Sequence, residues 1–424
     1  MTGSIWEVSA RSSSRSAPHE PYFARLEREL SELGPGRPAI LLDLDALDHN
    51  LAIVRRRRDT SLGLRIVAKS LPSVPLLRYV CEALGTQRLM VFDDSLAELA
   101  RELPSADLLL GKPMPLRAAA RFVERAREHL GRVTWLVDDQ QRLLRYLELA
   151  RRESVCLGIS IEIDVGLRRG GLDEPAALSP LLRIIADAPG QLRFAGLMGY
   201  DAHVGALGAV PRVAQSAYRS SLDRYAAFVE LLRSFDADWA AKAVCNGAGS
   251  KTYALHRSRG PLTEVALGSA LVMPTDFDVP ELAEHRPALF LAVPVLKRIE
   301  GTVLPMLDGV SRLWSRLDPD RELSYALYGG RWLARPWSPK GLVPHPVHGS
   351  STNQSMWSGS RRTGLEAEGT VFFRPTQSER VMSEHGPILL VRDGRITGAW
   401  EPLPLASRSE EHTLNSSHAN ISYA

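Results

Sequence analysis

Cysteine, long apolar runs and a strong excess of one charge are all lacking in this sequence of 424 residues. The three cysteines, Cys81, Cys156 and Cys245, have neither metal-site spacing nor the even count of a disulfide framework, which favours a reducing compartment. Because 52 basic residues nearly balance 49 acidic ones, neither nucleic acid nor a membrane surface is predicted as a partner. No run approaches the roughly 18 apolar residues of a membrane-spanning helix. These absences predict a soluble cytoplasmic protein.

The sequence does contain enough apolar material for more than one core. Hydrophobic residues make up 44% of the chain and charged residues 24%, as in ordinary globular proteins. A length of 424 residues exceeds the size at which one core stops growing, so we expect two domains. The arginine run at 55–58 follows the apolar residues Leu47, Leu51 and Val54, which predicts the solvated end of an amphipathic helix rather than a nucleic-acid patch.

Short apolar runs alternate with segments of helical periodicity over residues 38–284. The runs lie at 39–44, 64–69, 88–93, 107–111, 132–137, 156–165, 192–200 and 242–249. They lack polar alternation, which is typical of parallel strands buried on both faces. Eight strand–helix units predict a TIM-like (β/α)8 barrel over this range.

The alternation stops after residue 285, and strand-like runs separated by Gly, Pro and Asp turns follow. They lie at 288–299, 301–309, 322–333, 369–378 and 387–400, and predict a smaller, mainly-β domain over 285–405. The letters RDGRI at 392–396 are a hairpin signal. Residues 1–37 are expected to form a leader and an N-terminal helix. Residues 406–424 resemble translated sequencing-adapter DNA and are expected to be an unstructured, artefactual tail.

Lys69 ends an apolar strand, where a barrel gathers its chemistry. A lysine in a partly apolar pocket holds more free amine, which condenses with an aldehyde or ketone. The alternative is a strand-end lysine that extends its ammonium into solvent.

Two glycine-containing turns also follow predicted strands and suit an anion. Glycines let consecutive backbone N–H groups approach a phosphate closely. The turns comprise Asn246, Gly247, Ala248, Gly249 and Ser250, and then Gly268 and Ser269. Each turn alone is equally consistent with an ordinary tight turn. A phosphate site combined with a reactive lysine predicts pyridoxal phosphate as cofactor.

Two further strand ends carry polar residues of catalytic types. Arg168 and Arg169 lie in a glycine-flanked loop, where one could bind the cofactor's phenolate oxygen or a substrate carboxylate, or form a salt bridge between loops. Tyr200 could stack on or hydrogen-bond a ring. His203 suits a general base or a metal ligand, with a structural histidine as the alternative.

Taken in order, these motifs resemble the fold-type III pyridoxal-phosphate enzymes with alanine racemase-like barrels. Within them they resemble the D-threonine aldolase and D-serine dehydratase branch and its amino acid deaminase/aldolase subgroup. The resembling segments are 41–54, 65–70, 161–171, 196–205, 245–250 and 263–272, with the resemblance continuing into the β domain. The resemblance implies Lys69 as the Schiff-base lysine, Arg169 near the cofactor O3′ oxygen and His203 beside the substrate. It also implies that the two turns contact the cofactor's phosphate. It further implies that the protein forms a homodimer.

The sequence departs from this family at two places. Ala266 stands where the family often carries an arginine at the pyridine nitrogen, which leaves the cofactor's electron-sink strength open. The family's aldolases and dehydratases bind a divalent metal through a His-x-Asp or His-x-Cys pair near the C-terminus. Gln377 and Glu379 fall at those places here, and a glutamine amide is a poor transition-metal ligand. A metal therefore stays an open expectation, with these two residues as its candidates.

The resemblance implies a lyase that acts on small β-hydroxy amino acids, of D configuration. In the aldolase version His203 or a metal-bound water removes the β-hydroxyl proton, and Cα–Cβ cleavage gives glycine and an aldehyde. In the deaminase version Lys69 removes the Cα proton, and loss of hydroxide leads to a keto acid and ammonia. The alternatives are a racemase with Tyr325 or Tyr328 as second base, a non-catalytic cofactor carrier, and a barrel aldolase that uses Lys69 without a cofactor.

Overall fold

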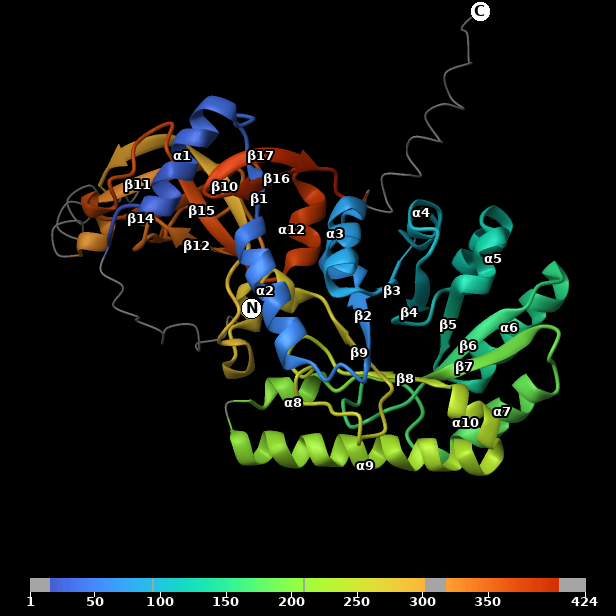
Figure 1. The fold of residues 1–424 in the computed structure, drawn as a ribbon. Helices are drawn as coiled ribbons and strands as arrows, with labels where there is room; N and C mark the ends of the chain where they lie inside the picture. Colours follow the sequence, from blue (N-terminus) through green and yellow to red (C-terminus); the bar gives the residue numbers. More distant parts are fainter. Residues whose placement is uncertain (1–15, 94, 209, 302–317, 404–424) are drawn as a thin grey trace, which may run out of the picture. The chain divides into compact units, whose positions relative to one another are not determined.

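The computed structural model describes residues 16–93, 95–208, 210–301 and 318–403. The chain divides into two compact units (Figure 1). Of the described residues, the barrel unit contains 45–93, 95–208, 210–288, 377–386 and 400–403, and the sheet unit contains 16–44, 289–301, 318–376 and 387–399. No helix in the described ranges is both long enough and apolar enough to cross a bilayer.

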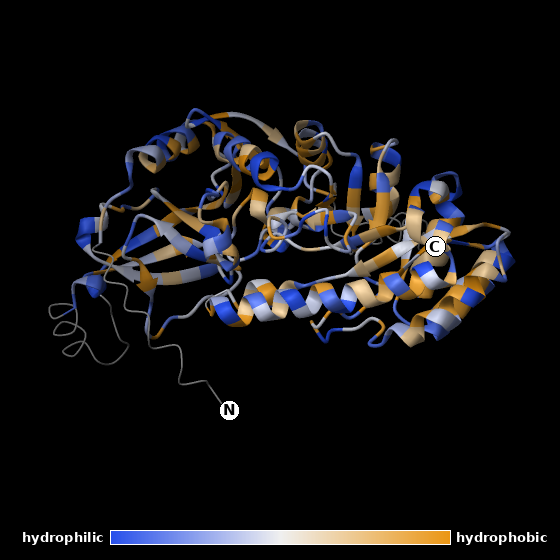
Figure 2. Ribbon diagram, turned by 60° about the horizontal axis from the view of Figure 1, so that its bottom comes forward, coloured by the Kyte–Doolittle hydropathy of each residue, from blue (hydrophilic) through white to orange (hydrophobic). Residues whose placement is uncertain are grey.

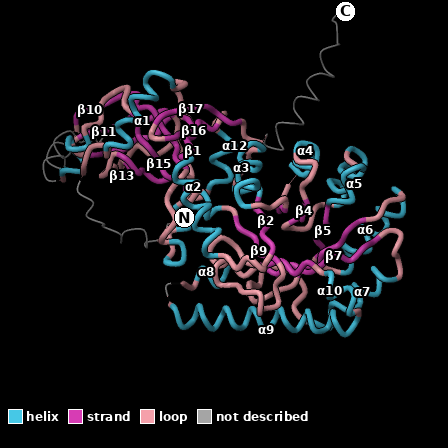
Figure 3. The backbone as a smooth tube through the Cα atoms, in the orientation of Figure 1, coloured by secondary structure: helices cyan, strands magenta, loops and turns pink. Residues whose placement is uncertain are grey.

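The barrel unit is built on a closed parallel barrel, drawn in magenta in Figure 3. Its strands, in barrel order, are β2 (Gly63–Val67), β3 (Arg88–Val91), β4 (Asp107–Leu110), β5 (Val133–Val137), β6 (Leu157–Glu162), β7 (Leu192–Gly199), β8 (Val244–Gly247) and β9 (Glu264–Leu267). Nearly every residue of these strands is shielded from solvent, as expected where helices cover the outside and side chains fill the inside. The predicted barrel is confirmed.

The rest of the barrel unit contains α-helices and short 3₁₀ helices. The α-helices are α2 (Leu44–Arg57), α3 (Val74–Leu84), α4 (Ser95–Glu102), α5 (Leu116–Arg125), α6 (Gln140–Glu153), α7 (Leu178–Ala186), α8 (Ala202–Ala206), α9 (Pro211–Phe235), α10 (Ala237–Lys242) and α12 (Ser378–Glu384). The 3₁₀ helices are η1 (Ala68–Ser70), η2 (Arg127–Arg132), η3 (Pro175–Ala177), η4 (Ser269–Leu271), η5 (Thr275–Phe277) and η6 (Pro280–Leu282). Hydrophilic and hydrophobic residues alternate along α9 (Figure 2), and its buried residues Ser221, Tyr225, Phe228 and Leu232 recur every three or four positions.

The barrel interior is layered along β9, β2, β3 and β4, which are neighbours in that order. The first layer is charged and contains Arg65, Arg88, Asp107 and Glu264. Side chains two residues apart on a strand share a face, so the next layer contains Val67, Met90, Leu109 and Ala266, which pack together. Two residues further lie Lys69, Phe92, Gly111 and Gly268, all of which line one cavity. An apolar layer therefore separates the mouth of the barrel from its charged base.

The charged layer is closed by hydrogen bonds. Arg65 Nε donates to Glu264 Oε1 at 2.5 Å, and Asn246 Nδ2 donates to the same oxygen at 2.8 Å. All three side chains are buried, so each depends on the others for the hydrogen bonds that water would otherwise supply.

The sheet unit contains an N-terminal helix and a mainly antiparallel sheet. Its elements are α1 (Pro21–Leu33), β1 (Ala39–Asp43), β10 (Leu289–Glu300), η7 (Pro319–Arg321), β11 (Leu323–Tyr328), β12 (Ala334–Ser338), β13 (Val343–Pro344), β14 (Gln354–Gly359), η8 (Arg361–Thr363), β15 (Thr370–Pro375), β16 (Ile388–Arg392) and β17 (Arg395–Trp400). The main strand order is β13-β14-β11-β10-β1-β16-β17, and β15 joins β10 to β12. This sheet confirms the mainly-β architecture that the sequence predicted for the second domain.

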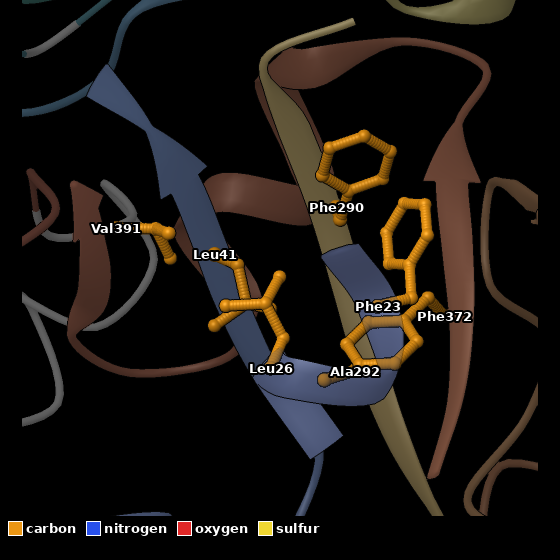
Figure 4. Packing of buried hydrophobic residues seen from close by; sticks show 7 residues of the cluster. All are labelled: Phe23, Leu26, Leu41, Phe290, Ala292, Phe372 and Val391. Atoms are coloured by element: carbon orange, nitrogen blue, oxygen red, sulfur yellow. The ribbon is translucent and has the colours of Figure 1, made fainter. Parts of the chain in front are cut away.

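Helix α1 covers one face of this sheet. Figure 4 shows the packed cluster, in which Phe23 and Leu26 of α1 meet side chains of β1, β10, β15 and β16. The sheet contributes Leu41, Phe290, Ala292, Phe372 and Val391. The three-residue spacing of Phe23 and Leu26 places both on one face of the helix.

One predicted barrel strand is wrong. The run at 39–44, taken from the sequence as the first barrel strand, contains β1, which lies in the sheet between β10 and β16. The eighth barrel strand is β9, the run that precedes Gly268. Apolar periodicity identifies a buried strand but carries no information about which sheet will pair with it.

The C-terminal hairpin is confirmed, and other predictions fall outside the described residues. Strands β16 and β17 are neighbours joined by Asp393 and Gly394, which have φ angles of 51° and 69°. Two positive φ values match the turn that a tight hairpin requires. The predicted strand at 301–309 lies outside the described residues from 302 onward, as do residues 1–15 of the leader and the tail at 406–424.

Candidate active site

The carboxyl ends of the barrel strands surround a cavity of about 120 Å³. Lys69 reaches it from η1, the single turn that follows β2. Every cofactor-binding residue predicted from the sequence lines this cavity. These residues are Lys69, Arg169, Tyr200, Asn246, Gly247, Ala248, Gly249, Ser250, Gly268 and Ser269. The barrel thus brings together residues that are up to 200 positions apart in the chain.

The amine of Lys69 lies between a carboxylate and an aromatic ring. Its Nζ is 3.1 Å from Oε1 of Glu379 and 4.6 Å from the ring centroid of Phe92. Glu379 belongs to α12, and Ser378 beside it donates a hydrogen bond of 2.9 Å to the backbone carbonyl of Ser70. Helix α12 is therefore tied directly to the turn that carries Lys69.

The two glycine-containing turns are joined through Ser250. Its Oγ accepts hydrogen bonds of 3.1 Å from the backbone N–H groups of Gly268 and Ala270. A Cβ atom at Gly268 would lie 2.9 Å from the carbonyl oxygen of Val67, so a side chain at this position would force the turn away from β2. The close approach keeps both glycine-containing turns at the cavity, and turns of this kind suit an anion.

Tyr200 and Arg169 form the side of the cavity. The guanidinium carbon of Arg169 lies 5.1 Å from the centroid of the Tyr200 ring, within the range of a cation–π contact. Burial, followed by the nearby carboxylate of Asp201, raises the pKa of Tyr200. The phenol consequently stays protonated at neutral pH and can donate a hydrogen bond. A Cβ atom at Gly249 would lie 2.7 Å from this ring.

A buried polar chain behind the first turn was not found from the sequence. Asp201 accepts from Thr252 Oγ1 at 2.7 Å and lies 2.7 Å from His256 Nε2. Thr252 Oγ1 in turn accepts from the backbone N–H of Gly249 at 3.0 Å. The chain holds the glycine turn in place. Asp201 and Thr252 fall within the motifs that carry Tyr200 and Ser250, so their polar character at strand ends is the signal that points to them.

His203 does not line the cavity. Its Nε2 lies 3.2 Å from Oγ of Ser221, whose hydroxyl donates to the carbonyl of Val165 at 2.8 Å. The imidazole therefore donates through Nε2 and links α8 to α9, and the Ser221 hydroxyl links α9 to the loop after β6. Arg168 is also turned to its own loop, with ion pairs to Asp164 and Asp173 at 3.6 Å and 3.4 Å.

The two candidate metal ligands have other partners. Gln377 Nε2 donates to Asp276 Oδ2 at 3.3 Å, and Glu379 contacts Lys69. Among the described residues, no group of three or more His, Cys, Asp or Glu is arranged to hold a metal ion. Ala266 lies in the apolar layer and brings no ionisable group to the cavity. The residues present do not fit a divalent metal.

The candidates for a second base lie in the sheet unit, on β11. Tyr325 is buried, and its hydroxyl is 3.1 Å from Oγ1 of Thr363, whereas Tyr328 is exposed. A further cavity, of about 480 Å³, lies where β3 and β4 begin and is lined by Cys81 and the ends of α3 and α4. It contains none of the predicted site residues.

Comparison with known proteins identifies the family. Residues 42–276 match the family described as the alanine racemase N-terminal domain. The chain belongs to this family. The family expected from the ordered motifs is thereby confirmed, and the matched range covers every strand of the barrel.

The relatives of this family member include lyases. A curated 3-hydroxy-D-aspartate aldolase of Paracoccus denitrificans (strain Pd 1222) is 26% identical over 246 residues, which cover 57% of this chain and 61% of that protein. The match thus spans less than two thirds of the relative.

Two solved structures share the fold. The D-threonine aldolase from Filomicrobium marinum has a TM-score of 0.68 at 20% identity, covering 87% of this chain and 97% of that one. The D-threo-3-hydroxyaspartate dehydratase from Delftia sp. HT23 has a TM-score of 0.64 at 18% identity, with coverage of 87% and 97%.

Pyridoxal phosphate, the cofactor that the fold implies, fits the cavity. Both glycine turns and the amine-bearing Lys69 line the same space, which suits a ligand that carries both a phosphate and an aldehyde. A Cβ atom at Gly249 would collide with the Tyr200 ring and one at Gly268 with Ser70 and Val67, so both turns need glycine to keep this shape around the cavity.

Proposed function

We propose that the protein is a pyridoxal-phosphate-dependent lyase of small β-hydroxy D-amino acids. The observation that carries the proposal is that Lys69 and both glycine turns line one cavity at the mouth of the barrel. Three of the protein's relatives, an aldolase of 3-hydroxy-D-aspartate, an aldolase of D-threonine and a dehydratase of D-threo-3-hydroxyaspartate, support the substrate class. Cleavage at the Cα–Cβ bond and loss of the β-hydroxyl are both compatible with this site.

The residues that would hold the cofactor follow from the cavity. The two glycine-containing turns, with the hydroxyl of Ser250, would bind its phosphate, while the N–H groups of Gly249 and Gly268 themselves donate to Thr252 and Ser250 and hold the turns in shape. Lys69 would bind its aldehyde carbon, and Arg169, which lines the same cavity, would pair with its phenolate oxygen. When bound, the cofactor supplies a conjugated ring that accepts the electrons released at Cα.

Proton handling falls to the residues around the amine. Lys69 Nζ and the Glu379 carboxylate, 3.1 Å apart, can hold and exchange a proton at the point where a substrate would meet the cofactor. The neutral Tyr200 phenol adds a hydrogen-bond donor. His203, held by Ser221 outside the cavity lining, gains no support from this geometry as the base, and its catalytic role stays a prediction.

The proposal is tested through Lys69. Purified protein loaded with pyridoxal phosphate is expected to absorb near about 420 nm, and Lys69→Ala is expected to abolish this band and lower turnover by at least about a thousandfold. Lys242→Ala, on the exposed last turn of α10, is the matched control and should leave both unchanged. A colourless wild-type protein without bound cofactor would refute the proposal.

Product analysis separates the reactions that the sequence left open. Incubation with D-threonine, D-serine and 3-hydroxyaspartate should give glycine and an aldehyde, or a keto acid and ammonia. Formation of the opposite enantiomer would indicate a racemase. Absence of any turnover by cofactor-loaded protein would indicate a carrier.

The proposal extends to location and assembly. All three cysteines are free, Cys81 half-buried, Cys156 exposed and Cys245 buried, which supports a reducing cytoplasm. We infer a homodimer without nucleic-acid or membrane partners, and the sedimentation of purified protein tests it. The domain limits given by the sequence stay predictions.

A further inference from the structure

A second cavity of the barrel unit, of about 470 Å³, adjoins the candidate active site. The two cavities share Lys69, Phe92 and Glu379. A substrate bound at Lys69 therefore has two spaces next to it. The cofactor would occupy the smaller one, between the glycine turns. The larger space is the one open to a substrate side chain.

Most of the charges that line the second cavity are already paired. Glu379 contacts Lys69 at 3.1 Å, and Arg380 forms an ion pair with Glu384 one turn further along α12. Asp93 accepts hydrogen bonds from the backbone N–H and the hydroxyl of Ser95, at 3.0 Å and 2.6 Å, and so caps the start of α4. These groups neutralise one another or a helix end.

Lys112 is the exception. No hydrogen bond or ion pair of its side chain occurs among the described residues, although its neighbour Gly111 lines the main cavity and Lys112 lines the second. Gly111 follows β4 directly, and Pro113 disfavours helical backbone at Lys112. Lys112, an exposed residue, thus follows the end of β4 at a position that lines the second cavity. Without an anion it adds positive charge to the second cavity.

We propose that the second cavity receives the substrate's side chain and that Lys112 binds a carboxylate there. The inference rests on the proposed function and narrows its substrate class to β-hydroxy amino acids with an acidic side chain. A side-chain carboxylate would form an ion pair with the unpaired ammonium of Lys112, whereas the methyl group of threonine cannot. Discrimination by one charge-assisted hydrogen bond amounts to about tenfold in affinity.

The kinetic test uses the cofactor-loaded enzyme with 3-hydroxyaspartate and D-threonine. The wild type is expected to favour 3-hydroxyaspartate in kcat/KM by about tenfold or more, and Lys112→Gln to remove this preference through KM. Lys112→Arg should retain it, because a cation remains. Lys242→Gln is the control for loss of a surface lysine. An equal effect of Lys112→Gln on both substrates, or no effect, would overturn the subsite.

A binding test separates this inference from the proposed function. Calorimetric titration of the loaded protein with succinate and with butyrate compares two carboxylates with one and requires no turnover. Succinate is expected to bind about tenfold more tightly than butyrate, and this difference should vanish in Lys112→Gln. Equal affinities in the wild type would refute the subsite even if the enzyme cleaves threonine. Tighter binding of succinate without turnover of any β-hydroxy amino acid would refute the lyase and retain the subsite.

Discussion

At the scale of single residues, the end of the cavity proposed to bind phosphate is organised by serine hydroxyl groups. Ser250 Oγ accepts from Gly268 and Ala270, and Ser269 Oγ donates to Ser70 Oγ at 3.0 Å. These contacts connect the turn after β8, the turn after β9 and the turn that carries Lys69. The anion site and the amine are therefore positioned by one hydrogen-bonded unit rather than independently.

Ser250→Ala is expected to weaken cofactor binding without unfolding the protein. The change removes a hydroxyl from the cavity and leaves two backbone donors without their acceptor, so the dissociation constant for pyridoxal phosphate should rise about tenfold. Titration of cofactor-free protein, followed by absorbance, measures it. Ser234→Ala, whose hydroxyl bonds only its own helix at Glu230, is the control. An unchanged dissociation constant in Ser250→Ala would contradict the role assigned to this residue.

At the scale of elements, the close approach of two barrel strands depends on one glycine. A Cβ atom at Gly196 of β7 would lie 2.0 Å from the carbonyl oxygen of Val244 on β8. The register between β6 and β7 also shifts at this level, between Ile159 and Ser160. β8 ends in the glycine turn, so the position of that turn depends on the spacing of these strands.

Gly196→Ala should therefore destabilise the barrel by at least about 3 kcal/mol, because neither strand backbone can yield without breaking the ladder. Urea denaturation followed by circular dichroism measures the change. Gly190→Ala is the matched control, since no atom lies within 4 Å of the Cβ it would add. Equal stabilities of the two variants would show that the strands can separate without cost.

At the scale of the whole molecule, the chain order and the spatial order differ. β1, near the N-terminus, pairs with β10 and with β16, which lie roughly 250 and 350 positions later in the sequence. The entire barrel is thus inserted between strands of one sheet. Pairing over such separations costs chain entropy before it gains contacts, so we expect the sheet unit to form after the barrel strands.

Mild acidification should lower the free energy of unfolding, and His285 is the residue responsible. Burial lowers the pKa of His285 to about 4, below its usual value of 6.5. The unfolded chain therefore takes up the proton first, and stability is lost as the pH falls from about 6.5 towards 4. This residue contributes a loss of about 1 to 2 kcal/mol between pH 7 and pH 5.

Urea midpoints of the wild type and of His285→Gln, at both pH values, measure this contribution. The variant should show a smaller decrease than the wild type, because it lacks the group that titrates. Other histidines act in both proteins and cancel in the comparison. Parallel decreases would show that His285 is not the group responsible.

Much of this architecture follows from local patterns in the sequence. Apolar runs of five to ten residues predicted the barrel, and Lys69, Gly249 and Gly268, at or just after the ends of predicted strands, were predicted to meet at one cavity. The prediction succeeds because parallel strands place all their carboxyl ends on one face of a barrel. The layered interior also follows from the sequence, because Arg65, Val67 and Lys69 are spaced two residues apart and therefore share one face of the strand.

Other features depended on which segments meet in three dimensions. The strand at 39–43 has the composition of a barrel strand, yet β10 and β16 supply the edges with which it pairs. His203 looks catalytic beside Tyr200 in the sequence, but the start of α8 turns it towards Ser221. Glu379 lies next to Lys69 only because α12 packs on the turn after β2. Spacing along the chain determines which face of an element a side chain occupies, whereas pairing and packing between distant elements determine what that face meets.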